Sequence, residues 1–155
     1  MKNQLLLSEA ARWIEKDIRP NIYAVVTLKQ LISVEQNGFR VWISGERCIY
    51  DQAAAKTLGQ ISRSIFKSAH RKFGKRLAVA TTLEGDGEFV RYHLNFLIHR
   101  PDWLPFEDLK YLFLKHWLKN EWALEITYFE ERTGDCVRYS LKEGLDSLLP
   151  RSTGF

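Results

Sequence analysis

Apolar and polar residues repeat along this chain with two different periods, one typical of strands and one typical of helices. Strand patterns are expected at 22–29, 76–84, 88–98 and 122–130. Helical spacing covers about 50–73 and the stretch that follows Pro105, and a shorter helix is expected at each end, from Ser8 to about Ile18 and over 136–149. Residues 31–48 contain turn signals at Asn37-Gly38 and Ser44-Gly45, which predict a hairpin or an irregular loop.

The long elements follow one another as strand, helix, strand, strand, helix, strand. This order predicts an α+β fold of the ferredoxin-like (RRM-like) kind, an antiparallel β-α-β-β-α-β sheet with its helices on one face. No repeat, linker or low-complexity run interrupts the pattern, so we expect residues 1–155 to form a single domain.

The strand expected at 88–98 carries two rows of side chains, because successive residues of a strand point to opposite faces. The row that should pack under the helices is apolar and consists of Val90, Tyr92, Leu94, Phe96 and Ile98. The other row contains Arg91, His93 and Asn95. In the preceding strand the corresponding row is small or polar, namely Ala78, Ala80, Thr82 and Glu84.

The polar side chains of these two rows can bind a metal ion. An imidazole, an amide oxygen and a carboxylate that face an open patch can bind a hard divalent cation such as Mg²⁺ or Mn²⁺. Alternatively, His93 and Asn95 are ordinary surface residues.

The turn between these two strands decides whether Glu84 can join this set. A two-residue turn at Asp86-Gly87 would place Glu84 opposite Phe89, four residues from the partner of His93, a separation of about 13 Å. Glu84 can therefore be a ligand only if the loop is wider or bulged.

Composition and charge narrow the class of protein. With 155 residues and 45% hydrophobic content, the chain can bury the core of one globular domain. Its apolar runs are shorter than a membrane span and its first residues lack a cleavage signal, so we expect a cytoplasmic protein with no membrane contact, in which Cys48 and Cys136 are free thiols.

The net charge of +4 is unevenly distributed, because residues 56–76 carry many basic side chains and no acidic one. If this block shares a face with the candidate site, its residues would contact nucleic acid together with Arg91; otherwise it is a solvated helix surface. The candidate contacts in the block are Lys67, Arg71, Lys72 and Lys75.

A second candidate for chemistry lies near the C-terminus, in the sequence RYSLKEG. Tyr139 and Lys142 are three residues apart and are neighbours on a helix, whereas Val137 and Leu141 point to another side and can be buried. With a metal ion polarising a phosphodiester and a lysine offsetting charge, a tyrosine can attack phosphorus. The alternative is an aromatic side chain that packs on the sheet.

These residues resemble the motifs of the histidine-hydrophobic-histidine (HUH) endonucleases, specifically the rolling-circle replication initiators (Rep proteins) of plasmids and phages. YAVVTLK is similar to the first strand motif of the family, HLNFLI to its metal motif and YSLK to its nucleophile motif, in the same order along the chain. The resemblance spans about residues 22–144.

The resemblance implies a metal-dependent DNA-nicking endonuclease and strand transferase that forms a covalent 5′-phosphotyrosine intermediate on single-stranded DNA. It would leave a 3′ hydroxyl for a separate polymerase and work with a separate helicase, since this chain has no Gly-rich phosphate loop. Tyr139 matches the nucleophile, Lys142 its basic neighbour and His93 the first metal ligand; Glu84 falls where relatives have an acidic ligand. Asn95 departs from the pattern, because it stands where a second histidine is expected.

Three other functions remain open at this stage. A single-tyrosine transposase would use the same chemistry, although the YxxK spacing favours the replication initiators. A catalytically impaired nucleic-acid-binding module on the same fold would explain Asn95. A protein-interaction domain that does not bind nucleic acid is disfavoured by the basic block.

Overall fold

The computed structural model describes residues 2–154. The elements that build the main sheet and its principal helices are β1 (Ile22–Leu28), α2 (Arg47–Phe66), β4 (Val79–Glu84), β5 (His93–Ile98), α4 (Phe106–Trp117) and β6 (Ala123–Glu131). The remaining elements are α1 (Lys2–Trp13), the π-helical turn η1 (Ile14–Ile18), β2 (Leu31–Gln36), β3 (Phe39–Ser44), α3 (Ser68–Phe73), α5 (Cys136–Ser140) and the 3-10 turn η2 (Leu145–Ser147).

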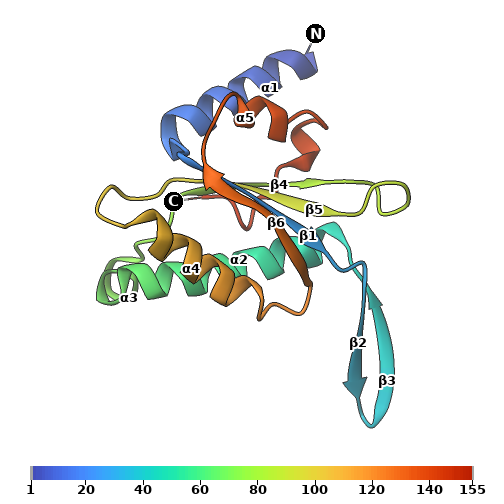
Figure 1. The fold of residues 1–155 in the computed structure, drawn as a ribbon. Coiled ribbons are helices and arrows are strands. Elements are labelled where there is room, and N and C mark those ends of the chain that lie inside the picture. Colours follow the sequence, from blue (N-terminus) through green and yellow to red (C-terminus); the bar gives the residue numbers. More distant parts are fainter. Residues whose placement is uncertain (1, 155) are drawn as a thin grey trace.

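The main sheet has four strands in the order β4-β5-β1-β6, and every neighbouring pair is antiparallel. Helices α2 and α4 lie on one face of this sheet (Figure 1). Strands β2 and β3 form a separate two-stranded hairpin that projects from the rest of the molecule (Figure 1). The structure is therefore an α+β fold with an antiparallel sheet, as the sequence predicts.

The larger hydrophobic core lies between this sheet and helices α2 and α4. Leu94, Phe96 and Ile98 of β5 are fully buried in it, as their alternation along the strand predicts. The ring of Phe96 contacts Phe113 and Trp117 of α4 at centroid distances of 5.4 and 5.7 Å. This packing turns His93 and Asn95 toward the other face of the sheet.

That second face is also covered by helices, so the expectation of helices on one face only is wrong. Segments α1 and α5 lie on the side opposite α2 and α4 (Figure 1). Their apolar side chains form a second hydrophobic cluster with the sheet residues Ala80 and Leu97. The other buried members of this cluster are Ile14 and Ile18 of η1, Cys136 and Val137 of α5, and Leu141, which follows α5. Burial of these apolar residues favours docking onto the sheet.

The connection between β4 and β5 is an eight-residue loop, 85–92, instead of the expected two-residue turn. The side chain of Asp86 holds it by accepting hydrogen bonds of 2.9 Å from the backbone amides of Glu88, Phe89 and Val90. Gly85 has a φ of 103°, and a Cβ there would lie 2.7 Å from the carbonyl oxygen of Arg91. Only glycine fits this position without strain.

The helix expected over 50–73 is divided into α2 and α3. Lys67 lies between them with a φ of 47°, in the left-handed region. Gly74, with a φ of 63°, ends α3 as the sequence predicts.

Candidate active site

Strands β4 and β5 bring Glu84, His93 and Asn95 together. Their register pairs Glu84 with His93 and Thr82 with Asn95, so all four side chains share one face of the sheet. The separation of about 13 Å that a tight turn would impose is absent because the loop over 85–92 is wide. Glu84 therefore lies beside the histidine.

The carboxylate of Glu84 is the centre of a polar cluster, and its side chain is only 5% exposed. Its Oε2 atom lies 2.9 Å from Nε2 of His93 and accepts a 3.0 Å hydrogen bond from Nδ2 of Asn95. Its Oε1 atom contacts the ammonium group of Lys142. Burial by itself would raise the pKa of Glu84, but the hydrogen bonds from Lys142, Asn95 and His93 outweigh it and lower the pKa. The carboxylate is therefore charged at neutral pH.

Asn95 is held from two sides and is 1% exposed. Its Nδ2 donates to Thr82 Oγ1 at 3.2 Å as well as to Glu84, and its Oδ1 accepts a 2.9 Å hydrogen bond from the hydroxyl of Tyr23 on β1. Burial raises the pKa of Tyr23 to about 12, so this hydroxyl keeps its proton. Tyr23 was not predicted from the sequence, because its hydrogen bond to Asn95 depends on the pairing of β1 with β5.

Tyr139 reaches the cluster from α5. The side chain of Asp135 caps this short helix by accepting a hydrogen bond from the backbone amide of Arg138. Val137 and Leu141 are buried while the side chain of Tyr139 is 53% exposed, which confirms the expected division of faces. Helix α5 ends at Ser140, so Lys142 belongs to the turn that follows it. Its Nζ nevertheless lies 4.0 Å from the centroid of the Tyr139 ring.

An open pocket of about 330 Å³ lies over these groups. Its lining consists of Tyr23, Val25, Glu84, His93, Asn95, Tyr128 and Tyr139. Tyr128 is a second aromatic residue that was not predicted from the sequence; its ring lies 5.7 Å from that of Tyr23. The pocket thus combines a buried carboxylate, an imidazole and an exposed tyrosine, and the ammonium of Lys142 lies beside it.

Both ring nitrogens of His93 face oxygen atoms. Its Nδ1 lies 3.1 Å from the carbonyl oxygen of Arg91 and its Nε2 lies 2.9 Å from Oε2 of Glu84, and both oxygens can only accept. A neutral ring has one proton for these two contacts, so in the tautomer with the proton on Nδ1 the lone pair of Nε2 faces Oε2 of Glu84. Two facing acceptors require a proton or a metal ion between them. Their 2.9 Å separation is also close to the roughly 3 Å between adjacent ligands of an octahedral Mg²⁺ ion.

The donor set fits a weak divalent-cation site made from unlike ligands. Within residues 2–154, no group of three or more His, Cys, Asp and Glu side chains could hold a metal ion. His93 and Glu84 supply two suitable atoms, and Asn95 supplies a third only if its amide turns so that Oδ1 replaces Nδ2. Tyr23 tolerates this reversal, because a hydroxyl can accept as well as donate.

The predicted nucleic-acid contacts divide into Arg91, near the site, and the basic block, away from it. Arg91 is exposed in the loop over 85–92, next to His93. The basic block follows the end of α2 and α3, on the side of the sheet opposite α5 (Figure 1). Its members Lys67, Arg71, Lys72 and Lys75 are exposed. They do not share a face with His93, so the expectation that the block and the candidate site lie on one surface is wrong.

Comparisons with protein-family models, with curated proteins and with solved structures find no match to this chain. In the part of the chain that the structure describes, every helix is too short or too polar to cross a lipid bilayer.

Proposed function

We propose that this chain is a metal-dependent single-stranded DNA nickase and strand transferase that initiates rolling-circle replication. The observation that carries the proposal is the convergence of Tyr139 and Lys142 on the pocket that contains Glu84, His93 and Asn95. These residues come from segments far apart in the sequence, and the HUH resemblance assigns them to one site.

The strand order supports a ferredoxin-like arrangement as part of the same proposal. Strands β1, β4, β5 and β6, with α2 and α4 between them, follow the order β-α-β-β-α-β. In this arrangement a single strand of DNA would lie on the face that carries His93 and Tyr139.

Tyr139 is the proposed nucleophile. Its hydroxyl oxygen attacks the phosphorus of a phosphodiester, the bond from phosphorus to the 3′ oxygen breaks, and the 5′ phosphate remains on the tyrosine. The phenolic proton leaves to solvent, to which Tyr139 is exposed, and the released 3′ oxygen takes a proton from water. A separate polymerase and helicase would then use the free 3′ hydroxyl.

Lys142 assists by charge. Its contact with Glu84 raises its pKa above the ordinary value, so the ammonium is retained at neutral pH and cannot serve as the base. Close to the Tyr139 ring, it can offset the negative charge that develops on the phosphate oxygens. His93, Glu84 and Asn95 would hold one Mg²⁺ or Mn²⁺ ion, which would polarise the scissile phosphate.

A non-catalytic DNA-binding module is the second candidate, and one observation favours it. The ammonium of Lys142 already neutralises Glu84, while Asn95 directs its nitrogen toward that carboxylate. With a proton on Nε2 of His93, the polar cluster is therefore satisfied without a metal ion.

Covalent capture of DNA separates the two candidates. The protein would be incubated with Mn²⁺ and a labelled pool of single-stranded oligonucleotides of random sequence, and resolved on a denaturing gel. We expect a metal-dependent adduct with the wild type and with Tyr128→Phe, the matched control from the same pocket, and none with Tyr139→Phe. DNA binding without an adduct under any divalent ion would favour the binding module.

A further inference from the structure

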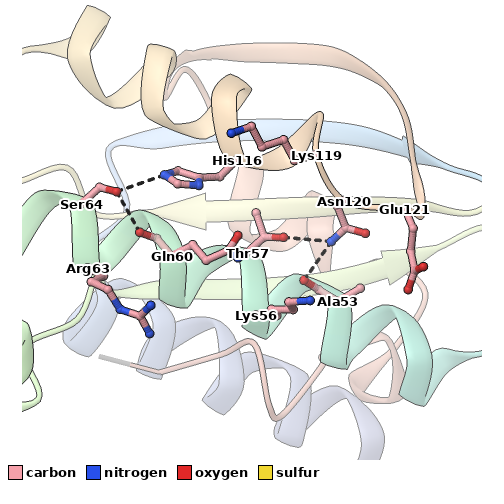
Figure 2. Close-up of a pocket in the computed structure, with 10 residues that line it drawn as sticks. All are labelled: Ala53, Lys56, Thr57, Gln60, Arg63, Ser64, His116, Lys119, Asn120 and Glu121. Carbon is pink, nitrogen blue, oxygen red and sulfur yellow. Dashed lines mark hydrogen bonds between the residues drawn. The ribbon is translucent and has the colours of Figure 1, made fainter.

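A second pocket, of about 480 Å³, lies between α2 and α4 (Figure 2). Helix α2 packs on the face of the sheet opposite His93 and Asn95, so this pocket is separate from the candidate active site. Its lining is mostly polar, with more basic than acidic side chains, and it comprises Ala53, Lys56, Thr57, Gln60, Arg63, Ser64, His116, Lys119, Asn120 and Glu121.

The lining has an excess of positive charge. Lys56, Arg63 and Lys119 contribute three positive charges, and Glu121 contributes the one negative charge among the described lining residues. Within residues 2–154, no ion pair involves any of these three cations. Gathering like charges around one hollow is unfavourable, and a bound anion would relieve the repulsion.

The wall of the pocket adds hydrogen-bonding groups. Ser64 Oγ donates to the carbonyl oxygen of Gln60 at 3.1 Å, so it accepts from Nε2 of His116, also at 3.1 Å. Burial, followed by repulsion from Lys115 and Lys119, lowers the pKa of His116. The imidazole thus experiences the positive field of the pocket, and an anion there would favour its protonated form.

The pocket is preformed, because Asn120 fixes the end of α4 to α2. Its Nδ2 donates to the carbonyl oxygen of Ala53 at 3.1 Å and to Thr57 Oγ1 at 2.9 Å (Figure 2). Its Oδ1 accepts from the backbone amide of Trp122 at 3.0 Å. The backbone around the pocket therefore needs little ordering when a ligand binds, whereas the exposed side chains of Lys56, Arg63 and Lys119 still have to be positioned.

We propose that this pocket binds a phosphate group, supplied either by a free phosphoanion or by the backbone of a nucleic acid. Phosphate suits the lining because the Arg63 guanidinium can bind two of its oxygens and the lysines act as point charges. A neighbouring hollow shares Arg63 and is lined by Lys67, Ser68, His70 and Arg71, so positive charge continues from the end of α2 onto α3. The site does not depend on the chemistry proposed for Tyr139.

The test uses the full chain without divalent ions and titrates it with pyrophosphate, followed by calorimetry and by the NMR signals of the His116 side chain. We expect binding, a shift of the His116 signals, and a loss of about tenfold or more in affinity in the Arg63→Gln/Lys119→Gln variant. The control is Arg12→Gln/Lys16→Gln, which removes the same charges from exposed positions on α1 and η1.

Absence of binding, or equal weakening in both variants, would overturn the proposal, because nonspecific attraction depends only on net charge.

A competition experiment then identifies the source of the phosphate. A single-stranded oligonucleotide that displaces pyrophosphate indicates a nucleic-acid backbone, and one that does not indicates a free phosphoanion. Thermal unfolding of both variants would show that they remain folded, and formation of the Tyr139 adduct is measured separately.

Discussion

At the scale of single residues, the buried carboxylate of Glu84 determines the properties of the candidate active site. It receives contacts from His93, Asn95 and Lys142, and a charge this deeply buried is tolerated only when it is paired. Lys142 therefore has a structural role in addition to the one proposed in catalysis.

We predict that Lys142→Met lowers the free energy of unfolding by about 1–3 kcal/mol, because it leaves a buried charged acceptor short of one partner. Urea unfolding at neutral pH measures this change. The double variant Glu84→Gln/Lys142→Met should lose less than the sum of the two single changes. Strict additivity would show that the interaction between Lys142 and Glu84 contributes nothing to stability.

Asn95→His tests the proposed cation site. Imidazole binds Mn²⁺ more strongly than an amide oxygen does, so we expect Mn²⁺ affinity to rise by about tenfold in a calorimetric titration. Asn95 is buried, and thermal unfolding must therefore confirm that the larger ring is accommodated. If neither protein binds Mn²⁺, the proposed metal site is wrong.

The alternation of residues along β5 was sufficient to place His93 and Asn95 on one face from the sequence. It could not reveal Tyr23, whose hydrogen bond to Asn95 depends on which residues of β1 and β5 are paired. Nor could it reveal the ion pair between Lys142 and Glu84, which requires the docking of α5 on the sheet.

At the scale of elements, the loop over 85–92 is long enough for the last residue of β4, Glu84, to pair with the first residue of β5, His93. We predict that Asp86→Ala accelerates hydrogen exchange at the amides of Glu88, Phe89 and Val90, because the variant removes their shared acceptor. Amides in the middle of β4 serve as the internal control. Unchanged exchange in the loop would mean that Asp86 does not organise it.

The same loop has a defined response to pH. The backbone hydrogen bonds from Val90 and Glu88 lower the pKa of Asp86, because they favour its charged form. Loop order should therefore be complete above the ordinary aspartate pKa of about 3.9 and lost only as the pH falls through the lowered value. Amide chemical shifts measured across an acid titration would follow this loss.

The end of a helix or strand could be predicted only where a residue type that favours such an end is present. Gly74 ends α3 as expected, whereas the break at Lys67 has no signature, since lysine has no preference for positive φ. Asp86-Gly87 was interpreted as a tight turn, and the structure shows that the Asp86 side chain instead holds a longer loop.

At the scale of the whole molecule, each face of the sheet has its own hydrophobic cluster. The sequence predicted the larger one from helical periodicity. The second was not anticipated, because it forms only when η1 and α5 dock on the sheet and bring Ile14 and Val137 into one cluster with Leu97.

The two free cysteines report on this second cluster. Cys48 is exposed, whereas Cys136 is buried in the cluster and burial raises the pKa of its thiol. A thiol-reactive disulfide at pH 8 should therefore modify one thiol quickly and the second only on unfolding. Cys48→Ser should remove the fast phase. Two fast thiols in the wild type would show that α5 does not remain packed on the sheet.

The basic block lies on the face away from the candidate active site, next to the proposed phosphate pocket, so it can contact only a DNA strand that extends onto that face. We predict that replacing Lys67, Arg71, Lys72 and Lys75 by glutamine weakens single-strand binding and reduces its salt slope by up to about 0.7 for each DNA phosphate that the variant no longer neutralises. Binding isotherms at several salt concentrations measure the slope. An unchanged slope would identify the block as an ordinary solvated surface.

The most direct test of the proposed function is the identity of the residue that becomes attached to DNA. Wild-type protein would be incubated with Mn²⁺ and the random single-stranded pool, digested with a protease and a nuclease, and analysed by tandem mass spectrometry. We predict a 5′-phosphonucleotide on Tyr139 and an unmodified Tyr128. A nucleotide on any other residue, or none on any peptide although DNA binds, would contradict the assignment of Tyr139 as the nucleophile.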